Sequence, residues 1–128
     1  MQDFYWFSFF VAVNALLLLL LTVNVSRLRM KNGISLGDGD NKALKASIRV
    51  HSNGTEQVPI YGLIVLALTL TGASTVVLCS LVLVFTLSRF VHAYGMLNKA
   101  FIFRRMGAAM TYASQAIAVI ALLLCLVR

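Results

Sequence analysis

The sequence predicts an all-α integral membrane protein, a four-helix bundle in which residues 1–128 form a single domain. Of the 128 residues, 60% are hydrophobic and only 12% are charged. The mean hydropathy of +0.89 is too high for a soluble protein of this size. Long uncharged runs also lie between basic segments, and a membrane helix needs about 20 mostly apolar residues.

The first helix is predicted at residues 4–29. Residues 4–26 carry no charge and would extend about 35 Å as a helix, enough to cross a bilayer. Aromatic residues near its start are typical of a membrane interface. Because Arg27, Arg29 and Lys31 follow the apolar run instead of preceding it, we expect a retained membrane helix and not a cleaved signal peptide.

The next two helices are predicted at residues 42–71 and 75–97. Residues 57–88 are uncharged, and a single helix of that length would measure about 48 Å, much longer than a bilayer core. A turn at residues 71–74, which read Thr-Gly-Ala-Ser, resolves this. Full spans on both sides of the turn then bring polar residues into one leaflet: Asn53, Glu56, Arg89 and His92, with Arg49 at the border.

The fourth helix is predicted at residues 105–127, after a basic loop. Apart from Arg128, the Lys and Arg residues lie around the first and third loops. This pattern predicts that both loops are cytoplasmic and that both termini lie on the opposite side. The net charge of +7 is therefore interpreted as a topology signal, and no nucleic-acid partner is expected. Asp38 and Asp40 are too few for a calcium site, and no metal site is predicted.

The polar cluster indicates a bound anion. Ionisable groups at membrane depth usually face a bundle interior and mark a functional site. The cluster has more arginine than carboxylate, and Arg104 and Arg105 at a helix N-terminus would pair well with a carboxylate or thiolate. Glu56 suits an ammonium group. Glutathione offers these groups, but a purely structural network, in which Arg49 or Arg89 neutralises Glu56, also fits the residues.

Four segments resemble motifs of the MAPEG family, the membrane-associated proteins of eicosanoid and glutathione metabolism. Residues 49–59 read R-x-H-x-N-x-x-E-x-x-P, residues 89–95 read R-x-x-H-A-x-G, and residues 104–107 read R-x-x-G. Residues 36–41 resemble the LGDGGN loop of bacterial members. The resemblance covers nearly the whole chain. It implies a homotrimer that binds glutathione between subunits at the cytoplasmic leaflet.

The resemblance also implies roles for individual residues. Arg104 would be the catalytic residue, because a nearby cation favours the nucleophilic thiolate. Whether Arg104 or Arg105 contacts the sulfur stays open. So does the question whether Tyr94 or Tyr112 replaces the tyrosine that many members carry where this chain has Met96. The residues expected to bind glutathione are Arg27 (across the subunit interface), Arg49, Asn53, Glu56, Arg89, His92 and Arg105.

The expected function is that of a membrane-bound glutathione transferase in a bacterial inner membrane. Its second substrate would be a lipophilic electrophile or a lipid hydroperoxide that arrives from the membrane lipid. Two alternatives stay open. One is a non-catalytic scaffold or modulator with the same fold. The other is a small multidrug transporter, which is less favoured because the first helix has no carboxylate after Asp3.

Overall fold

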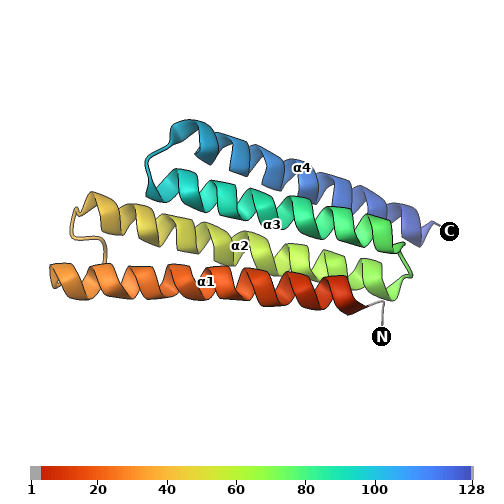
Figure 1. Ribbon diagram of the computed structural model, residues 1–128, viewed down its shortest axis with the longest axis horizontal. Coiled ribbons are helices and arrows are strands. Elements are labelled where there is room, and N and C mark those ends of the chain that lie inside the picture. Colours follow the sequence, from red (N-terminus) through yellow and green to blue (C-terminus); the bar gives the residue numbers. More distant parts are fainter. Residues whose placement is uncertain (1–3, 128) are drawn as a thin grey trace.

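The computed structural model describes residues 4–127, which contain four helices and no strand. Asp3 and Arg128 lie outside the described residues. The helices are α1 (Tyr5–Asn32), α2 (Lys42–Leu70), α3 (Thr75–Leu97) and α4 (Phe101–Leu126). They run alternately up and down, so the α1–α2 and α3–α4 loops share one end of the bundle (Figure 1). The predicted all-α four-helix fold is confirmed.

Three helices, α1, α3 and α4, are long and apolar enough to cross a membrane. The first half of α2 carries Lys42, Lys45, Arg49 and Glu56, so α2 is too rich in charged residues to be identified as a membrane span from its composition. However, α2 lies between α1 and α3 and runs along the same length of the bundle (Figure 1). We infer that it crosses the membrane together with its neighbours.

Two polar side chains define where α2 and α3 begin. The Asn41 Oδ1 atom accepts a hydrogen bond from the Leu44 N–H at 2.9 Å, and the Ser74 Oγ atom accepts one from the Val77 N–H at 3.4 Å. Such caps satisfy donors that the first helical turn leaves unpaired. The predicted turn at residues 71–74 is confirmed, since α2 ends at Leu70 and α3 begins at Thr75.

The start of α4 differs from the prediction. The helix begins at Phe101 and not at residue 105, and the Arg104 N–H donates to the Ala100 carbonyl at 3.0 Å. Arg104 therefore lies one turn inside the helix, and its own N–H is not a free anion donor. Ala100 provides no side-chain cap, so the sequence carried no start signal there. Likewise α1 continues past residue 29 to Asn32, where Gly33 (φ 64°) ends it.

The bundle is held together by an aromatic cluster and by buried polar contacts. The Tyr61 and Phe85 rings stack at a centroid distance of 3.8 Å, and Phe10 packs against both. The fully buried Asn14 side chain donates from Nδ2 to the Thr86 Oγ1 atom at 3.0 Å. Interhelical hydrogen bonds of this kind join helices where lipid offers no hydrophobic driving force.

We expect Tyr61→Phe to destabilise the bundle by about 1 kcal/mol, because a buried hydrogen-bonded group loses its partner. The Tyr61 hydroxyl donates to the Leu81 carbonyl at 2.9 Å and lies 2.8 Å from the Ser114 Oγ atom. The ring stack is kept in this variant. Thermal unfolding in detergent measures the effect, and Tyr112→Phe, on the exposed side of α4, is the control. Equal melting temperatures for Tyr61→Phe and the wild type would contradict it.

Candidate functional site

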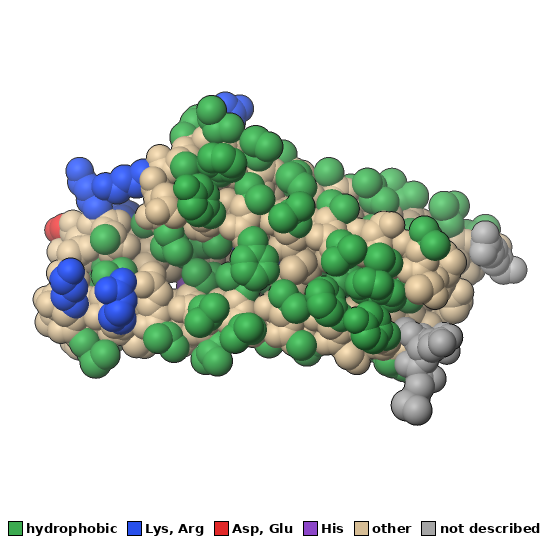
Figure 2. Space-filling view, viewed as in Figure 1, with side chains coloured by type: hydrophobic (Ala, Val, Ile, Leu, Met, Phe, Trp, Pro, Cys, Tyr) green, Lys and Arg blue, Asp and Glu red, His purple; other side chains and the backbone are tan. Residues whose placement is uncertain are grey.

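The end of the bundle that carries the α1–α2 and α3–α4 loops is strongly basic. Lys and Arg side chains gather at this end, whereas hydrophobic side chains cover most of the remaining length of the visible face (Figure 2). The C-termini of α1 and α3 and the N-termini of α2 and α4 meet here (Figure 1). The fold therefore brings together basic residues from distant parts of the sequence.

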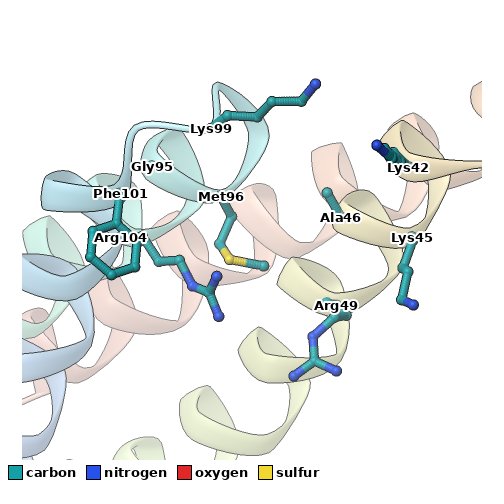
Figure 3. Close-up of a pocket in the computed structure, with 9 residues that line it drawn as sticks. All are labelled: Lys42, Lys45, Ala46, Arg49, Gly95, Met96, Lys99, Phe101 and Arg104. Carbon is teal, nitrogen blue, oxygen red and sulfur yellow. The ribbon is translucent and has the colours of Figure 1, made fainter.

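A cavity of about 380 Å³ opens between the start of α2 and the α3–α4 corner. We call it the basic cavity. In Figure 3, the Arg49 and Arg104 side chains extend from opposite sides toward the space around the Met96 side chain. None of the described residues that line it is a carboxylate. Its lining residues are Lys42, Lys45, Ala46, Arg49, Gly95, Met96, Lys99, Phe101 and Arg104.

A second hollow, of about 240 Å³, continues along α2 from the basic cavity. It is lined by Arg49, Ser52, Asn53 and Glu56, and we call it the α2 cleft. Arg49 lines both spaces and so connects them. The only acidic residue among the predicted site residues, Glu56, is exposed on the surface of α2. The two hollows together offer several cations and one carboxylate.

Arg89 is buried behind the α2 cleft. Its Nη2 atom donates to the Asn53 Oδ1 atom at 2.7 Å, and its Nη1 atom donates to the Thr111 Oγ1 atom at 3.4 Å. Only 3% of the side chain is exposed. A buried guanidinium with these neutral acceptors holds Asn53 in place. In the single chain, Arg89 therefore orients a cleft residue and does not itself line the cleft.

His92 lies on α3 where that helix packs closely against Gly107 of α4. It is buried, and its Nδ1 atom has no hydrogen-bond partner within residues 4–127. A Cβ atom at Gly107 would overlap the backbone of His92, and one at Gly95 would overlap the backbone of Phe103 and Arg104. These two glycines allow α3 and α4 to touch and so determine where Arg104 lies.

Besides the buried Arg89, two predicted arginines, Arg27 and Arg105, do not line the basic cavity. Arg27 is exposed on α1, where its Nη2 atom donates to the Asn24 Oδ1 atom at 2.9 Å. The Arg105 guanidinium lies over the Phe101 ring, 5.4 Å from its centroid. Of the two adjacent arginines on α4, Arg104 is thus the one that lines the cavity within this chain.

Neither tyrosine considered as a replacement at position 96 lines the basic cavity. Tyr94 is exposed and packs edge-on against Phe103 at a centroid distance of 5.5 Å. Tyr112 lines a separate hollow on α4. Met96 itself lines the cavity, so no phenol hydroxyl from these positions is available there within the chain.

The sequence interpretation missed three lysines of the cavity, Lys42, Lys45 and Lys99. A signal existed for two of them. Lys42, Lys45 and Arg49 follow one another at spacings of three and four, which places them on one face of a helix. Lys99 carries no such signal, because it lies in the α3–α4 loop and reaches the cavity only through the tertiary fold.

A family model described as MAPEG family matches residues 7–124. The chain belongs to the MAPEG family. Inner membrane protein YecN of Escherichia coli (strain K12) is 34% identical over 116 residues, which cover 89% of this chain and 87% of YecN. The protein of the same name from Escherichia coli O6:H1 (strain CFT073) matches equally well. This MAPEG membership, together with the apolar helices, establishes a membrane protein.

In this MAPEG chain, Asn53→Ala is expected to cost about 2 kcal/mol of stability, because it leaves a buried charged donor without its closest acceptor. The donor is the Arg89 Nη2 atom. Thermal unfolding in detergent measures the loss, and Ser52→Ala, an exposed neighbour, should unfold like the wild type. If Asn53→Ala also unfolds like the wild type, Asn53 does not anchor Arg89.

Proposed function

We propose that this protein is a membrane-bound glutathione transferase that activates glutathione for attack on lipophilic electrophiles, with peroxidase activity toward lipid hydroperoxides. The observation that carries the proposal is the basic cavity, which Arg49 and Arg104 line and whose described lining has no carboxylate, joined at Arg49 to a cleft that contains Glu56. The MAPEG family includes glutathione transferases, whereas the name of YecN gives no activity.

The charges of the two hollows match the groups of glutathione. Its two carboxylates and its thiolate are anions, which fixed arginines stabilise through charge-assisted hydrogen bonds. Its ammonium group suits the carboxylate of Glu56. We assign the peptide part to Arg49, Asn53 and Glu56 in the α2 cleft, with Arg89 holding Asn53 in position.

We assign to Arg104 the role of contacting the glutathione sulfur and stabilising its thiolate form. In the transferase reaction the thiol releases its proton to solvent, and the thiolate forms a bond to the electrophilic carbon while the leaving group departs with the bonding electrons. A cation beside the sulfur favours the thiolate and so increases the fraction of reactive glutathione. In the peroxidase reaction, two glutathione molecules are oxidised to the disulfide while the hydroperoxide is reduced to an alcohol and water.

The exposed face of α2 supports assembly into a homotrimer. Arg49 and Glu56 are both exposed in the single chain, and Glu56 lies halfway along a helix that is inferred to cross the membrane. A charge facing lipid at that depth is costly. A neighbouring subunit would cover this face, and its α1 could bring Arg27 to the glutathione.

The proposed location is a bacterial inner membrane, with the basic end at the cytoplasmic leaflet and both termini on the opposite side. Basic residues flanking membrane helices favour the cytoplasmic side. The end of the bundle where Lys and Arg side chains gather (Figure 2) is the end that holds the α1–α2 and α3–α4 loops (Figure 1). The relative YecN is named an inner membrane protein.

The test uses the purified full chain in detergent. We expect calorimetry to detect glutathione binding, and we expect conjugation of a chloronitrobenzene electrophile at a rate proportional to the protein concentration. Arg49→Ala should weaken binding, because this residue lines both hollows. Absence of both glutathione binding and conjugation would refute the proposed transferase activity. Binding without turnover of the electrophile or of a hydroperoxide would instead support the scaffold, and proton-coupled drug uptake in vesicles would support the transporter.

A further inference from the structure

The basic cavity contains more positive charge than the proposed glutathione site uses. Arg49 and Arg104 are assigned to glutathione, and three further lysines, Lys42, Lys45 and Lys99, line the same cavity. The described lining has no carboxylate, and no acidic residue occupies the first turn of α2 or α4. No acidic residue in the described cavity wall therefore balances the mutual repulsion among these lysines.

The lysines and the arginines lie at different depths along the bundle. Lys42 is the first residue of α2, and Arg49 follows about 10 Å further along the helix axis. Lys99 lies in the α3–α4 loop, at the same end as Lys42 (Figure 3). Lys42 and Lys99 thus lie at the outer mouth of the cavity, where the phosphates of a surrounding bilayer would lie, and Lys45 follows one turn of α2 before Arg49. Arg49 lies deeper, at the entrance to the α2 cleft.

An apolar surface borders this charged mouth. Phe101 lines the cavity and is 62% exposed, and the adjacent Ile102 is 70% exposed. Both lie in the first turn of α4, which starts at this end of the bundle. A small free anion would gain nothing from these side chains. A ligand with an anionic head and an apolar tail would use both surfaces.

We propose that Lys42, Lys45 and Lys99 bind the phosphate headgroup of an anionic phospholipid, whose acyl chains pack along the exposed start of α4. The bound phosphate would offset the repulsion among the lysines and so stabilise the bundle. This lipid site does not depend on the glutathione chemistry, since it uses side chains that the proposed reaction does not.

The experiment measures the melting temperature of the full chain in a neutral detergent during titration with a short-chain phosphatidylglycerol. Matched titrations use a phosphatidylcholine of the same chain length and inorganic phosphate. We expect phosphatidylglycerol alone to raise the melting temperature. An equal rise with inorganic phosphate would overturn the proposed lipid ligand and indicate a site for free anions. An equal rise with phosphatidylcholine would overturn the proposal by showing that the charge of the headgroup is not recognised.

The variants test whether the three lysines are the site. Each lysine close to an anionic lipid surface contributes about a fivefold gain in affinity. The triple variant Lys42→Gln, Lys45→Gln, Lys99→Gln should therefore bind phosphatidylglycerol on the order of a hundredfold more weakly. Lys31→Gln, an exposed lysine at the end of α1 that does not line the cavity, is the control and should bind like the wild type. Unchanged binding by the triple variant would overturn the proposal.

Glutathione binding by the same variants separates the two proposals. If the triple variant loses phosphatidylglycerol but keeps glutathione, the lipid site is distinct, as proposed. If it loses both equally, the three lysines bind glutathione as well, and the proposal of a lipid site distinct from the glutathione site is overturned. If the wild type binds phosphatidylglycerol but no glutathione, the lipid site stands and the proposed function fails.

Discussion

Arg104→Gln is expected to lower the rate of glutathione conjugation by about a hundredfold, the usual cost of removing one group that stabilises a developing or fixed negative charge in an active site. Glutathione binding should weaken much less, because the peptide part is assigned to residues of the α2 cleft. Thiolate absorbance of bound glutathione gives a direct second measurement. It should fall in the variant, since the sulfur loses its neighbouring cation.

The control for this prediction is the adjacent residue. Arg105→Gln removes the same charge from the next position of α4, but its guanidinium lies over Phe101 and does not line the basic cavity. It should keep most of the thiolate signal. If Arg105→Gln loses the signal and Arg104→Gln keeps it, then Arg105 contacts the sulfur in the assembled protein, and the assignment to Arg104 is wrong.

Gly95→Ala is expected to destabilise the bundle by about 3 kcal/mol, at the upper end of the range for overpacked interiors. The added methyl group would overlap the backbone of Phe103 and Arg104, which cannot rotate away as a side chain can. The helices α3 and α4 would have to separate, and Arg104 would move with α4. We therefore expect a lower unfolding temperature together with a lower rate of glutathione conjugation.

Gly54→Ala is the matched control, because it adds the same methyl group to another buried helical glycine. The added Cβ atom would lie 2.6 Å from the Leu18 Cδ2 atom, which is the end of a flexible side chain that can move aside. Alanine also favours a helix over glycine by about 1 kcal/mol, so this variant should unfold close to the wild type. Equal stability of Gly95→Ala and Gly54→Ala would contradict the close backbone contact between α3 and α4.

The candidate site was partly predictable. Arg49, Asn53 and Glu56 were grouped correctly on one stretch of α2, because helical spacing alone places them together, and they line one cleft. The start of α4 could not be predicted, because Ala100 gives no capping signal and the charges of Arg104 and Arg105 suggested a boundary that is not there. The contact between Arg89 and Asn53 depends on how α3 packs against α2.

The sequence by itself determined that this chain forms apolar helices for a membrane, where the turn between α2 and α3 falls, and to which family it belongs. The apolar helices and the turn follow from local composition, since an uncharged run of sufficient length has a single favourable environment and a run longer than one span needs a break. The family follows from the motifs at residues 36–41, 49–59, 89–95 and 104–107. Only the tertiary structure decided that Arg104, and not Arg105, lines the cavity within this chain, and that Lys99 lines the same cavity as Lys42. It also decided that Arg89 donates a hydrogen bond to Asn53 and holds that side chain in place. Those outcomes depend on helix rotation and on the close approach at Gly95 and Gly107, which bring together residues distant in sequence.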